Sequence, residues 1–331
     1  MAKASRDLAE CVERADVVVE VRDARLPFSS SNPLLDAVSS GGYSSNGSNE
    51  RNKPRVVVFN KADLADPQLQ HRVTAAVAAD AVSKRGGSKS QTTSLFLSAD
   101  RGANIAALLK AIDSVSPPAL FQRVAGSVVV VVGVPNCGKS SLINAMKKDA
   151  NNGRDMIEKG SGGKASTAPT PGWTRSVSTF RVRKAPPLYV LDSPGVMPPR
   201  IPDVETGLKL AVTGAISAAA SPPARIQVEF LLHFFEGISP IAPERVGKAL
   251  GLSKGYTADQ VDLCLEVLAT RLGLLRKRNN GANNQIVDEP DIDAAAKSFL
   301  KSFQQGELGR YTMDFVTRES GKNIFRGDTE Q

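Results

Sequence analysis

The chain has 331 residues and a formal net charge of +8, from 42 Lys and Arg against 34 Asp and Glu. This length predicts two domains, since one domain holds roughly 100–200 residues. Three scattered cysteines exclude a disulfide framework and a four-ligand zinc site, and they favour a reducing compartment. The longest apolar run, around Val128–Val132, is far shorter than the ~20 residues that cross a bilayer. The positive charge leaves a polyanionic partner open, because surplus charge also serves solubility.

Short valine-rich runs alternate with helical stretches over the first two thirds of the chain. Turn residues bound each run, which is typical of the buried strands of an α/β sheet. We therefore predict a six-stranded, mostly parallel sheet. Its strands are expected at Asp16–Val21, Arg55–Phe59, Ser94–Leu97, Ser127–Val132, Val177–Val182 and Leu188–Leu191. Two Gly/Ser/Asn-rich segments, 39–52 and 84–94, are predicted to be surface insertions.

The pattern changes after about Asp203, beyond which we predict no further strand. Thr257–Leu272 and Asp291–Phe303 carry apolar residues at helical spacing, and this spacing is typical of helices that share a core. The prediction is an α/β domain over residues 1–203, followed by an α-helical C-terminal domain over 204–331.

The segment Gly133–Ser140 reads G-x-x-x-x-G-K-S and follows a predicted strand directly. This is the pattern of a phosphate-binding P-loop, in which backbone N–H groups converge on phosphates at a helix N-terminus. Lys139 is predicted to reach the β- and γ-phosphates, and Ser140 to ligate Mg²⁺. The nucleotide-contacting residues predicted here are Pro135, Asn136, Cys137, Gly138, Lys139, Ser140 and Ser141.

A second motif, Asn60-Lys61-Ala62-Asp63, follows the predicted strand Arg55–Phe59 and reads N-K-x-D. Guanine offers two parallel donors, N1–H and the 2-amino group, which one carboxylate accepts together; adenine lacks this pair. We assign Asp63 to these donors, place Lys61 over the ring, and expect Asn60 to brace the loop. The pair Ser98-Ala99 follows another strand, and a backbone N–H there is predicted to meet guanine O6.

Two further motifs after the P-loop are typical of γ-phosphate sensors. Pro171–Thr174 offers Thr174 as a second ligand of Mg²⁺ and a sensor of the γ-phosphate. Asp192–Gly195 reads D-x-x-G, so Asp192 is expected to hold Mg²⁺ through water and the Gly195 N–H to contact the γ-phosphate. Together the motifs predict a GTPase whose Mg²⁺ site is formed by Ser140, Thr174 and Asp192.

The order of these motifs is rotated. In ordinary small GTPases the phosphate motifs come first, whereas here Asn60–Asp63 and Ser98-Ala99 precede the P-loop and Asp192–Gly195 comes last. The strands still close one sheet if the domain is circularly permuted, because the termini of α/β domains tend to lie close together. Asp23–Pro27 then marks the strand that ordinarily follows D-x-x-G.

In all these features the sequence resembles the circularly permuted GTPases of the YlqF/RbgA family, and its mitochondrial members in particular. The resemblance implies a GTP-driven assembly factor that binds a precursor of the large ribosomal subunit, contacts its rRNA and ribosomal proteins, and works beside other assembly factors. It implies a mitochondrial monomer; a bacterial relative is cytoplasmic. The segments that carry the resemblance are Asp23–Pro33, Asn60–Asp63, Gly133–Ser140, Pro171–Thr174, Asp192–Gly195, Leu210–Ile216 and Gly306–Asp314.

The same resemblance bears on hydrolysis. Val196 stands where many GTPases carry a Gln that positions the attacking water. The resemblance implies a hydrophobic residue at this position, as is usual in the family. Asn136 resembles an asparagine that helps to bind K⁺ in related enzymes, so we group it with Lys139, Thr174 and Gly195 as candidate catalytic residues. A catalytic histidine of the family precedes a Met-Ala-Lys-Ala stretch, which here is Met1–Ala4. Either the protein has lost this histidine or the true start lies upstream; we expect the second, with any targeting segment upstream as well. A low intrinsic rate, raised by ribosomal particles and K⁺, is predicted.

Two other functions stay open. The first is a GTP-bound scaffold that holds a ribosomal precursor and barely hydrolyses; the second is a signalling GTPase with protein partners only, which the motif Gly306–Asp314 disfavours. The charge supports an RNA partner, since residues 147–184 hold nine basic and three acidic side chains, a net of +6. Binding of a phosphate backbone through this stretch would depend strongly on salt.

Overall fold

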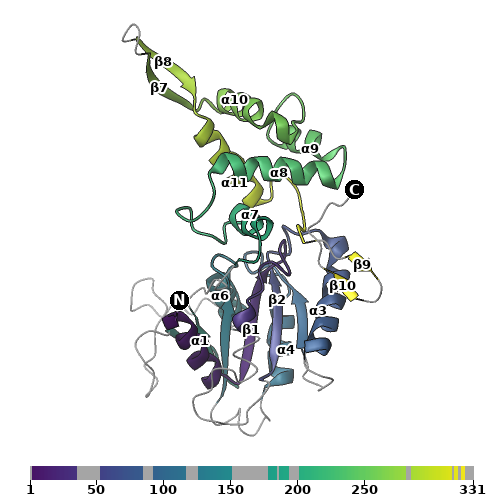
Figure 1. Cartoon of the computed structure of the whole chain (residues 1–331). Coiled ribbons are helices and arrows are strands. Elements are labelled where there is room, and N and C mark those ends of the chain that lie inside the picture. The colour runs from purple at the N-terminus through teal and green to yellow at the C-terminus, as the bar shows by residue number, and fades with distance from the viewer. Residues whose placement is uncertain are drawn as a thin grey trace. The chain divides into compact units, whose positions relative to one another are not determined.

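The computed structural model describes residues 2–35, 53–84, 92–116, 126–150, 178–184, 186–193, 201–280, 285–314, 317–319 and 322–324. The chain forms two compact units (Figure 1). One unit comprises Met1–Ile201 together with Asp314–Gln331, and the other comprises Pro202–Met313. The chain thus returns to the first unit at Asp314, whereas the predicted division assigned everything after residue 203 to the second domain.

The first unit contains a six-stranded sheet in the order β3-β2-β1-β4-β6-β5. All neighbouring strands pair in parallel except β5, which runs antiparallel to β6, so the predicted six-stranded, mostly parallel sheet is confirmed. The strands are β1 (Val17–Asp23), β2 (Arg55–Asn60), β3 (Thr92–Phe96), β4 (Ser127–Gly133), β5 (Ser178–Lys184) and β6 (Pro187–Asp192).

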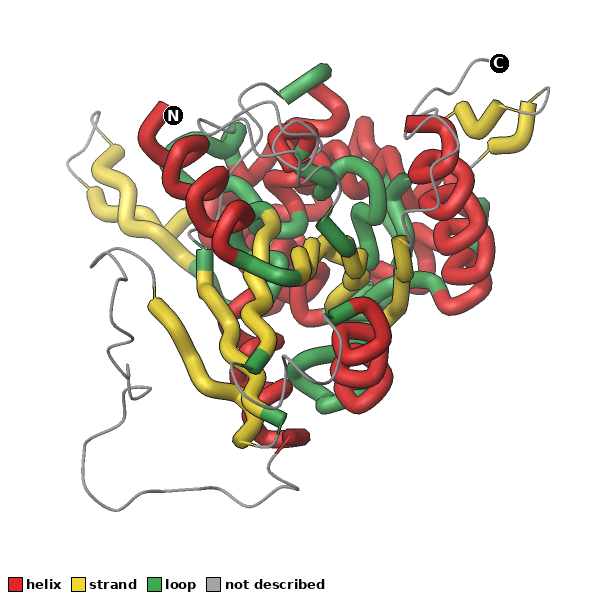
Figure 2. The backbone as a smooth tube through the Cα atoms, turned by 90° about the horizontal axis from the view of Figure 1, so that it is seen from below, coloured by secondary structure: helices red, strands yellow, loops and turns green. Residues whose placement is uncertain are grey.

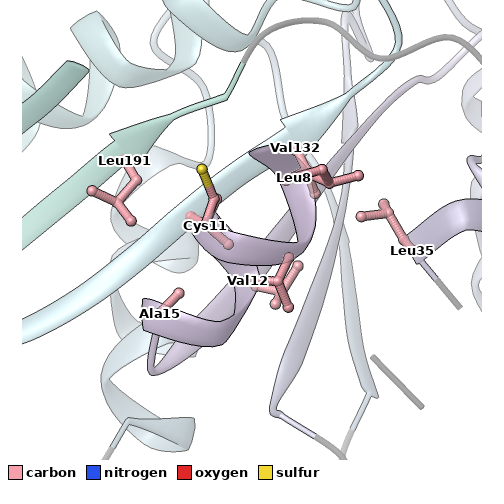
Figure 3. Close-up of a cluster of buried hydrophobic side chains, with 9 residues drawn as sticks. Leu8, Cys11, Val12, Ala15, Leu35, Val132 and Leu191 are labelled. Atoms are coloured by element: carbon pink, nitrogen blue, oxygen red, sulfur yellow. The ribbon is translucent and has the colours of Figure 1, made fainter. Parts of the chain in front are cut away.

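Helices cover both faces of this sheet (Figure 2), which explains why its central strands are runs of valine rather than alternating sequences. On one face, α1 (Ala2–Arg14) packs Leu8, Cys11 and Val12 against the sheet (Figure 3). On the same face, α3 (Gln70–Lys84) packs Val73 and Val77 against β2. Two helices, α4 (Ile105–Val115) and α6 (Lys139–Ala150), pack together and against β2 and β4. Ahead of α3 lies a short 3-10 helix, η1 (Pro67–Leu69).

The direction of the strand order reverses between β1 and β4. From β1 the chain proceeds to β2 and β3 on one side, and it then crosses to β4 and β6 on the other. In open α/β sheets, ligands bind outside the carboxyl ends of the strands at such a switch point. A ligand site is therefore expected at the carboxyl ends of β1 and β4.

The second unit is mainly helical, and its elements are α7 (Val204–Val212), α8 (Ala224–Ile238), α9 (Ala242–Ala249), η2 (Ala258–Gln260), α10 (Val261–Leu272) and α11 (Ile292–Gln305). Helix α11 packs against both α8 and α10. The fully buried rings of Phe235 and Phe299 stand in its core, together with Leu231 and Leu265. The apolar stripes of the sequence therefore form a helical core. In the described part of the chain, no helix combines the length and apolarity that a membrane span requires.

The prediction that strands cease after Asp203 is wrong. Antiparallel β7 (Leu275–Asn280) and β8 (Gln285–Pro290) form a hairpin between α10 and α11, and β9 (Thr317–Glu319) pairs with β10 (Lys322–Ile324). In the first hairpin Arg276 lies opposite Glu289 and Lys277 opposite Asp288. Opposite charges stabilise such cross-strand pairs, but they produce no apolar alternation that a sequence pattern could reveal.

The two predicted insertions are only partly visible. Residues 39–52 lie outside the described part of the chain. Of 84–94, Lys84 is the last residue of α3, and Thr92 to Ser94 belong to β3. The third strand thus begins two residues before its predicted start, inside the segment assigned to the insertion.

Candidate functional site

The predicted motifs converge at the carboxyl edge of the sheet. Asp23 ends β1, Asn60 ends β2, Gly133 ends β4 and Asp192 ends β6, while Ser98 follows β3. Because these five strands run parallel to one another, their carboxyl ends lie along one edge. Motifs separated by more than a hundred residues in the sequence are thereby brought to the switch point.

The P-loop is a tight turn between β4 and α6. A Cβ atom on Gly133 would lie 2.3 Å from the Val21 carbonyl oxygen of β1, and one on Gly138 would lie 2.2 Å from Nδ2 of Asn60. Gly138 also has a φ of +91°, a conformation that side chains rarely allow. Both glycines are required because neighbouring motifs pack directly against the loop.

The side chain of Lys139 is folded into this loop. Its Nζ donates to the carbonyl oxygens of Val134 at 2.9 Å and of Gly133 at 3.2 Å, and the residue is buried. Lys139 also begins α6, so the N–H groups of Lys139, Ser140 and Ser141 belong to the first turn, where helical geometry supplies no carbonyl partner. A cation and a helix N-terminus thus share one position, which favours a phosphate.

Other P-loop residues differ in what they expose. Asn136 and Ser140 are exposed, Pro135 and Ser141 are half-buried, and Cys137 is buried. Burial raises the pKa of the Cys137 thiol to about 11, so the thiol is neutral at physiological pH. The carbonyl of Cys137 accepts a hydrogen bond from Asn60. The predicted contact of Cys137 with a nucleotide would therefore use its backbone N–H.

Asn60 connects the P-loop to the base motifs. Its Nδ2 donates to the Cys137 carbonyl at 2.9 Å, and its Oδ1 accepts from the Ala99 N–H at 3.0 Å. The side chain is almost completely buried. One amide group therefore holds together the loop after β4, the turn after β2 and the turn after β3.

Lys61 makes a second connection to the P-loop. Its Nζ donates to the Asn136 carbonyl at 2.8 Å and lies 3.2 Å from Oδ2 of Asp23. Lys61 has a φ of +60°, in the left-handed region that residues other than glycine rarely adopt. The lysine of the N-K-x-D motif thus spans from the end of β1 to the P-loop.

Asp23 is a site residue whose role the sequence did not reveal. Besides Lys61, its carboxylate accepts from Nε of Arg25 at 2.9 Å and from Nη2 of Arg25 at 2.7 Å. Burial alone would raise the pKa of Asp23, but Arg25 and Lys61 outweigh it and hold the pKa well below its usual range. The available signals were its position just after a predicted buried strand and its place in the segment Asp23–Pro33, which carries the family resemblance.

The residues predicted to contact guanine form hydrogen bonds within the protein. Asp63 accepts through Oδ2 from Nε of Arg101 at 2.9 Å, and Arg101 itself is largely exposed. The Ser98 N–H donates to the Ala103 carbonyl and the Ala99 N–H to Asn60. A contact of either N–H with guanine O6 would have to be shared with these bonds.

Of the three residues predicted to hold Mg²⁺, the structure describes Ser140 and Asp192. Ser140 offers a hydroxyl at the start of α6, and Asp192 offers a carboxylate at the end of β6, where the Ser193 hydroxyl donates to the Val131 carbonyl at 2.8 Å. Burial raises the pKa of Asp192, and Lys139 and Lys147 oppose this shift. Hydroxyl and carboxylate oxygens suit Mg²⁺, which completes its shell with water and substrate phosphates. Thr174 and Gly195 lie outside the described residues.

Among the described residues, no cluster of three or more His, Cys, Asp or Glu side chains could hold a metal by itself. Such a cluster is not needed for Mg²⁺ in a nucleotide site, because the phosphates contribute ligands. The residues present therefore fit an ion that is held jointly with a nucleotide.

Comparison with known proteins identifies similar chains. Residues 128–250 match a family described as "50S ribosome-binding GTPase". The mouse protein named mitochondrial ribosome-associated GTPase 1 is 31% identical over 320 residues, which cover 95% of this chain and 88% of the relative. Ribosome biogenesis GTPase A of Bacillus pumilus is 32% identical over 283 residues, covering 83% of this chain and 85% of the relative.

A solved structure shares the fold. The GNP-bound structure of YlqF from T. maritima aligns over 97% of this chain and 100% of its own, with a TM-score of 0.54 and 22% sequence identity. At this identity the likeness concerns the fold alone. The predicted α/β GTPase fold is therefore confirmed by an independent comparison.

Proposed function

The chain belongs to the YlqF/RbgA family of ribosome-associated GTPases, and from this premise we propose that it hydrolyses GTP as an assembly factor of the large ribosomal subunit in mitochondria. One observation carries the proposal for the nucleotide. Asn60 and Lys61 both donate to P-loop carbonyls, so hydrogen bonds hold the base motif against the phosphate motif at the switch point of the sheet. Two motifs held together in this way suit a ligand with a base at one end and phosphates at the other.

Different residues are assigned to the base, the phosphates and Mg²⁺. Asp63 would accept the two guanine donors while Lys61 lies over the ring, and the N-terminal N–H groups of α6 would hold the phosphates. On binding, Lys139 would transfer its ammonium from the loop carbonyls to the β- and γ-phosphates. Ser140, Thr174 and Asp192 would hold Mg²⁺, which neutralises phosphate charge. The Gly195 N–H would contact the γ-phosphate.

Hydrolysis of GTP to GDP and phosphate needs a positioned water and added positive charge. Val196 cannot orient water as a Gln does. We therefore propose a low intrinsic rate that ribosomal particles and K⁺ raise, with Asn136 near the ion. The Asn136 side chain is exposed in the P-loop, while its carbonyl is bonded to Lys61. An ion placed there would supply charge beside the phosphates.

The proposed ribosomal partner is a precursor of the large subunit, contacted through rRNA and ribosomal proteins. The net charge of +6 in residues 147–184 exceeds what one GTP requires and supports contact with a phosphate backbone. Mitochondrial residence rests on the similarity to mitochondrial relatives. Imaging of the protein tagged at its C-terminus tests it, since cytoplasmic signal alone would contradict it.

A second function is favoured by Val196: a GTP-bound scaffold on the same precursor that scarcely hydrolyses. Single-turnover hydrolysis of radiolabelled GTP by the full chain, with and without large-subunit precursors and in K⁺ or Na⁺, separates the two functions. We expect precursors to raise the rate by at least about tenfold, equivalent to about 1.4 kcal/mol, and K⁺ to exceed Na⁺. Lys139→Ala serves as the inactive control.

Each other result has a definite meaning. Precursor binding that needs GTP but does not accelerate hydrolysis would establish the scaffold. GTP hydrolysis without any association with large-subunit particles or crosslinking to rRNA would reject the ribosomal role and favour a signalling GTPase.

A further inference from the structure

Asp314 is the last residue of the tail motif Gly306–Asp314, and no residue of this motif is assigned to the nucleotide site. Its carboxylate is buried and accepts three hydrogen bonds from a turn near the start of the chain. Oδ2 accepts from the N–H groups of Phe28 and Ser29, each at 2.8 Å, and Oδ1 accepts from the Ser29 hydroxyl at 2.6 Å. Asp314 and this turn belong to the same compact unit, although 286 residues separate Asp314 from Phe28.

The turn that Asp314 holds is itself bonded to the end of β1. The Ser30 hydroxyl accepts from the Asp23 N–H at 3.1 Å, and the Ser30 N–H donates to the Leu26 carbonyl at 3.1 Å. Nη1 of Arg22 donates to the Pro27 carbonyl at 3.0 Å. The position of Asp23 therefore depends on the conformation of the residues that follow it.

Asp23 in turn leads to the nucleotide site. Its Oδ2 lies 3.2 Å from Nζ of Lys61, which donates to the Asn136 carbonyl of the P-loop. A path of hydrogen bonds, short backbone links and one ion pair thus runs from Asp314 through the turn after β1 to the lysine that is assigned to the guanine ring. Every residue of the path is buried or half-buried except Asn136, which is exposed. Buried hydrogen-bond networks of this kind hold geometry firmly.

We propose that Asp314 is a positioning residue for guanine nucleotide binding. By fixing the Phe28–Ser29 turn it fixes Asp23, and Asp23 fixes the ammonium of Lys61 against the P-loop. Nucleotide retention then depends on the return of the chain to the first unit after Met313. This inference rests on the proposed function only in taking the site to bind guanine nucleotides.

The test is the affinity of the full chain for fluorescent GDP after substitution of this contact. Asp314→Ala removes both carboxylate oxygens and with them all three hydrogen bonds to the turn, and we expect the Kd for GDP to rise about tenfold, equivalent to about 1.4 kcal/mol. Ser29→Ala removes the hydroxyl bond alone and is expected to raise the Kd about threefold. Asp113→Asn is the matched control, because Asp113 pairs with Arg183 in the same unit and touches no member of the path.

Coupling to Lys61 distinguishes positioning from general destabilisation. In a Lys61→Ala background, Asp314→Ala should change the Kd by less than about twofold, because the lysine that it positions is gone. An unchanged Kd in folded Asp314→Ala, or an equal rise in both backgrounds, would overturn the inference. Should Asp314→Ala fail to fold, Ser29→Ala and its double mutant with Lys61→Ala decide in the same way.

The two proposals fail in different ways. Wild-type protein that binds no GDP contradicts the proposed function. Wild-type protein that binds GDP while the Asp314 and Ser29 variants bind it equally well contradicts only the role of Asp314.

Discussion

Two buried carboxylates on β1, Glu20 and Asp23, are both held by ion pairs, but their partners lie in different parts of the molecule. Glu20 lies within the sheet, where Nε of Arg22 and Nε of Arg55 donate to it at 2.9 and 3.0 Å. Asp23 lies at the strand end, where Arg25 and Lys61 neutralise it. The cations of Glu20 come from β1 and β2 themselves, whereas Lys61 also reaches the P-loop. Position along one strand thus separates a group that stabilises the sheet from one that contacts the proposed binding site.

Removal of Glu20 should give the largest effect on stability. Glu20→Gln leaves two buried guanidinium groups without their carboxylate, and breaking a buried ion pair in this way costs about 3–5 kcal/mol. Chemical denaturation measures this loss. The folded fraction should keep its GDP affinity, because Glu20 itself contacts no nucleotide motif and Arg22 can keep its bond to the Pro27 carbonyl. A large rise in Kd would remove the distinction between the two carboxylates.

Acid should weaken the same interaction. Burial by itself raises the pKa of Glu20, but Arg22 and Arg55 lower it from 4.5 to about 2. A lowered pKa stabilises the fold above the ordinary pKa, and this contribution disappears as pH falls through the lowered value. The wild type should therefore lose about 3 kcal/mol more than Glu20→Gln as pH falls from about 5 to about 2, since each pKa unit is worth about 1.4 kcal/mol. Parallel stability curves for the two proteins would contradict this assignment.

Removal of Lys61 should affect binding more than folding. Lys61→Ala deletes the ammonium that is proposed to lie over the guanine ring, and interactions with a charged donor contribute about 1.5–3 kcal/mol. We expect the Kd for GDP to rise roughly 10–100-fold. Arg25 still pairs with Asp23, so the free energy of unfolding should change by only about 1 kcal/mol. Calorimetric titration together with denaturation checks both; an unfolded variant would show that Asp23 needs Lys61 as Glu20 needs its arginines.

The smallest effect is expected at Arg101. Its ion pair with Asp63 is formed by a largely exposed guanidinium, and exposed pairs contribute about 0–1 kcal/mol. Arg101→Ala should therefore change the Kd for GDP by no more than about fivefold. A rise in Kd as large as that of Lys61→Ala would show that Arg101 orients Asp63 and contributes to the site as strongly as Lys61 does.

Sequence patterns located the strands and motifs but not the contacts between them. Gly133–Ser140 and Asn60–Asp63 could be recognised because glycine spacing and strand context are local properties. The bonds of Asn60 to Cys137 and of Asp314 to Ser29 join residues 77 and 285 positions apart, which no periodicity encodes. The β7–β8 hairpin escaped prediction because charge pairing, not apolar alternation, accompanies its register. The roles of Thr174 and Gly195 stay predictions.

The most direct test of the central claim is a comparison of GDP and ADP binding to the full chain in the presence of Mg²⁺ by titration calorimetry. Asp63, Lys61 and the P-loop together predict micromolar or tighter binding of GDP and no measurable binding of ADP, because adenine lacks the two donors that Asp63 accepts. Equal binding of the two nucleotides, or no binding of GDP, would contradict a guanine nucleotide site at the carboxyl edge of the sheet.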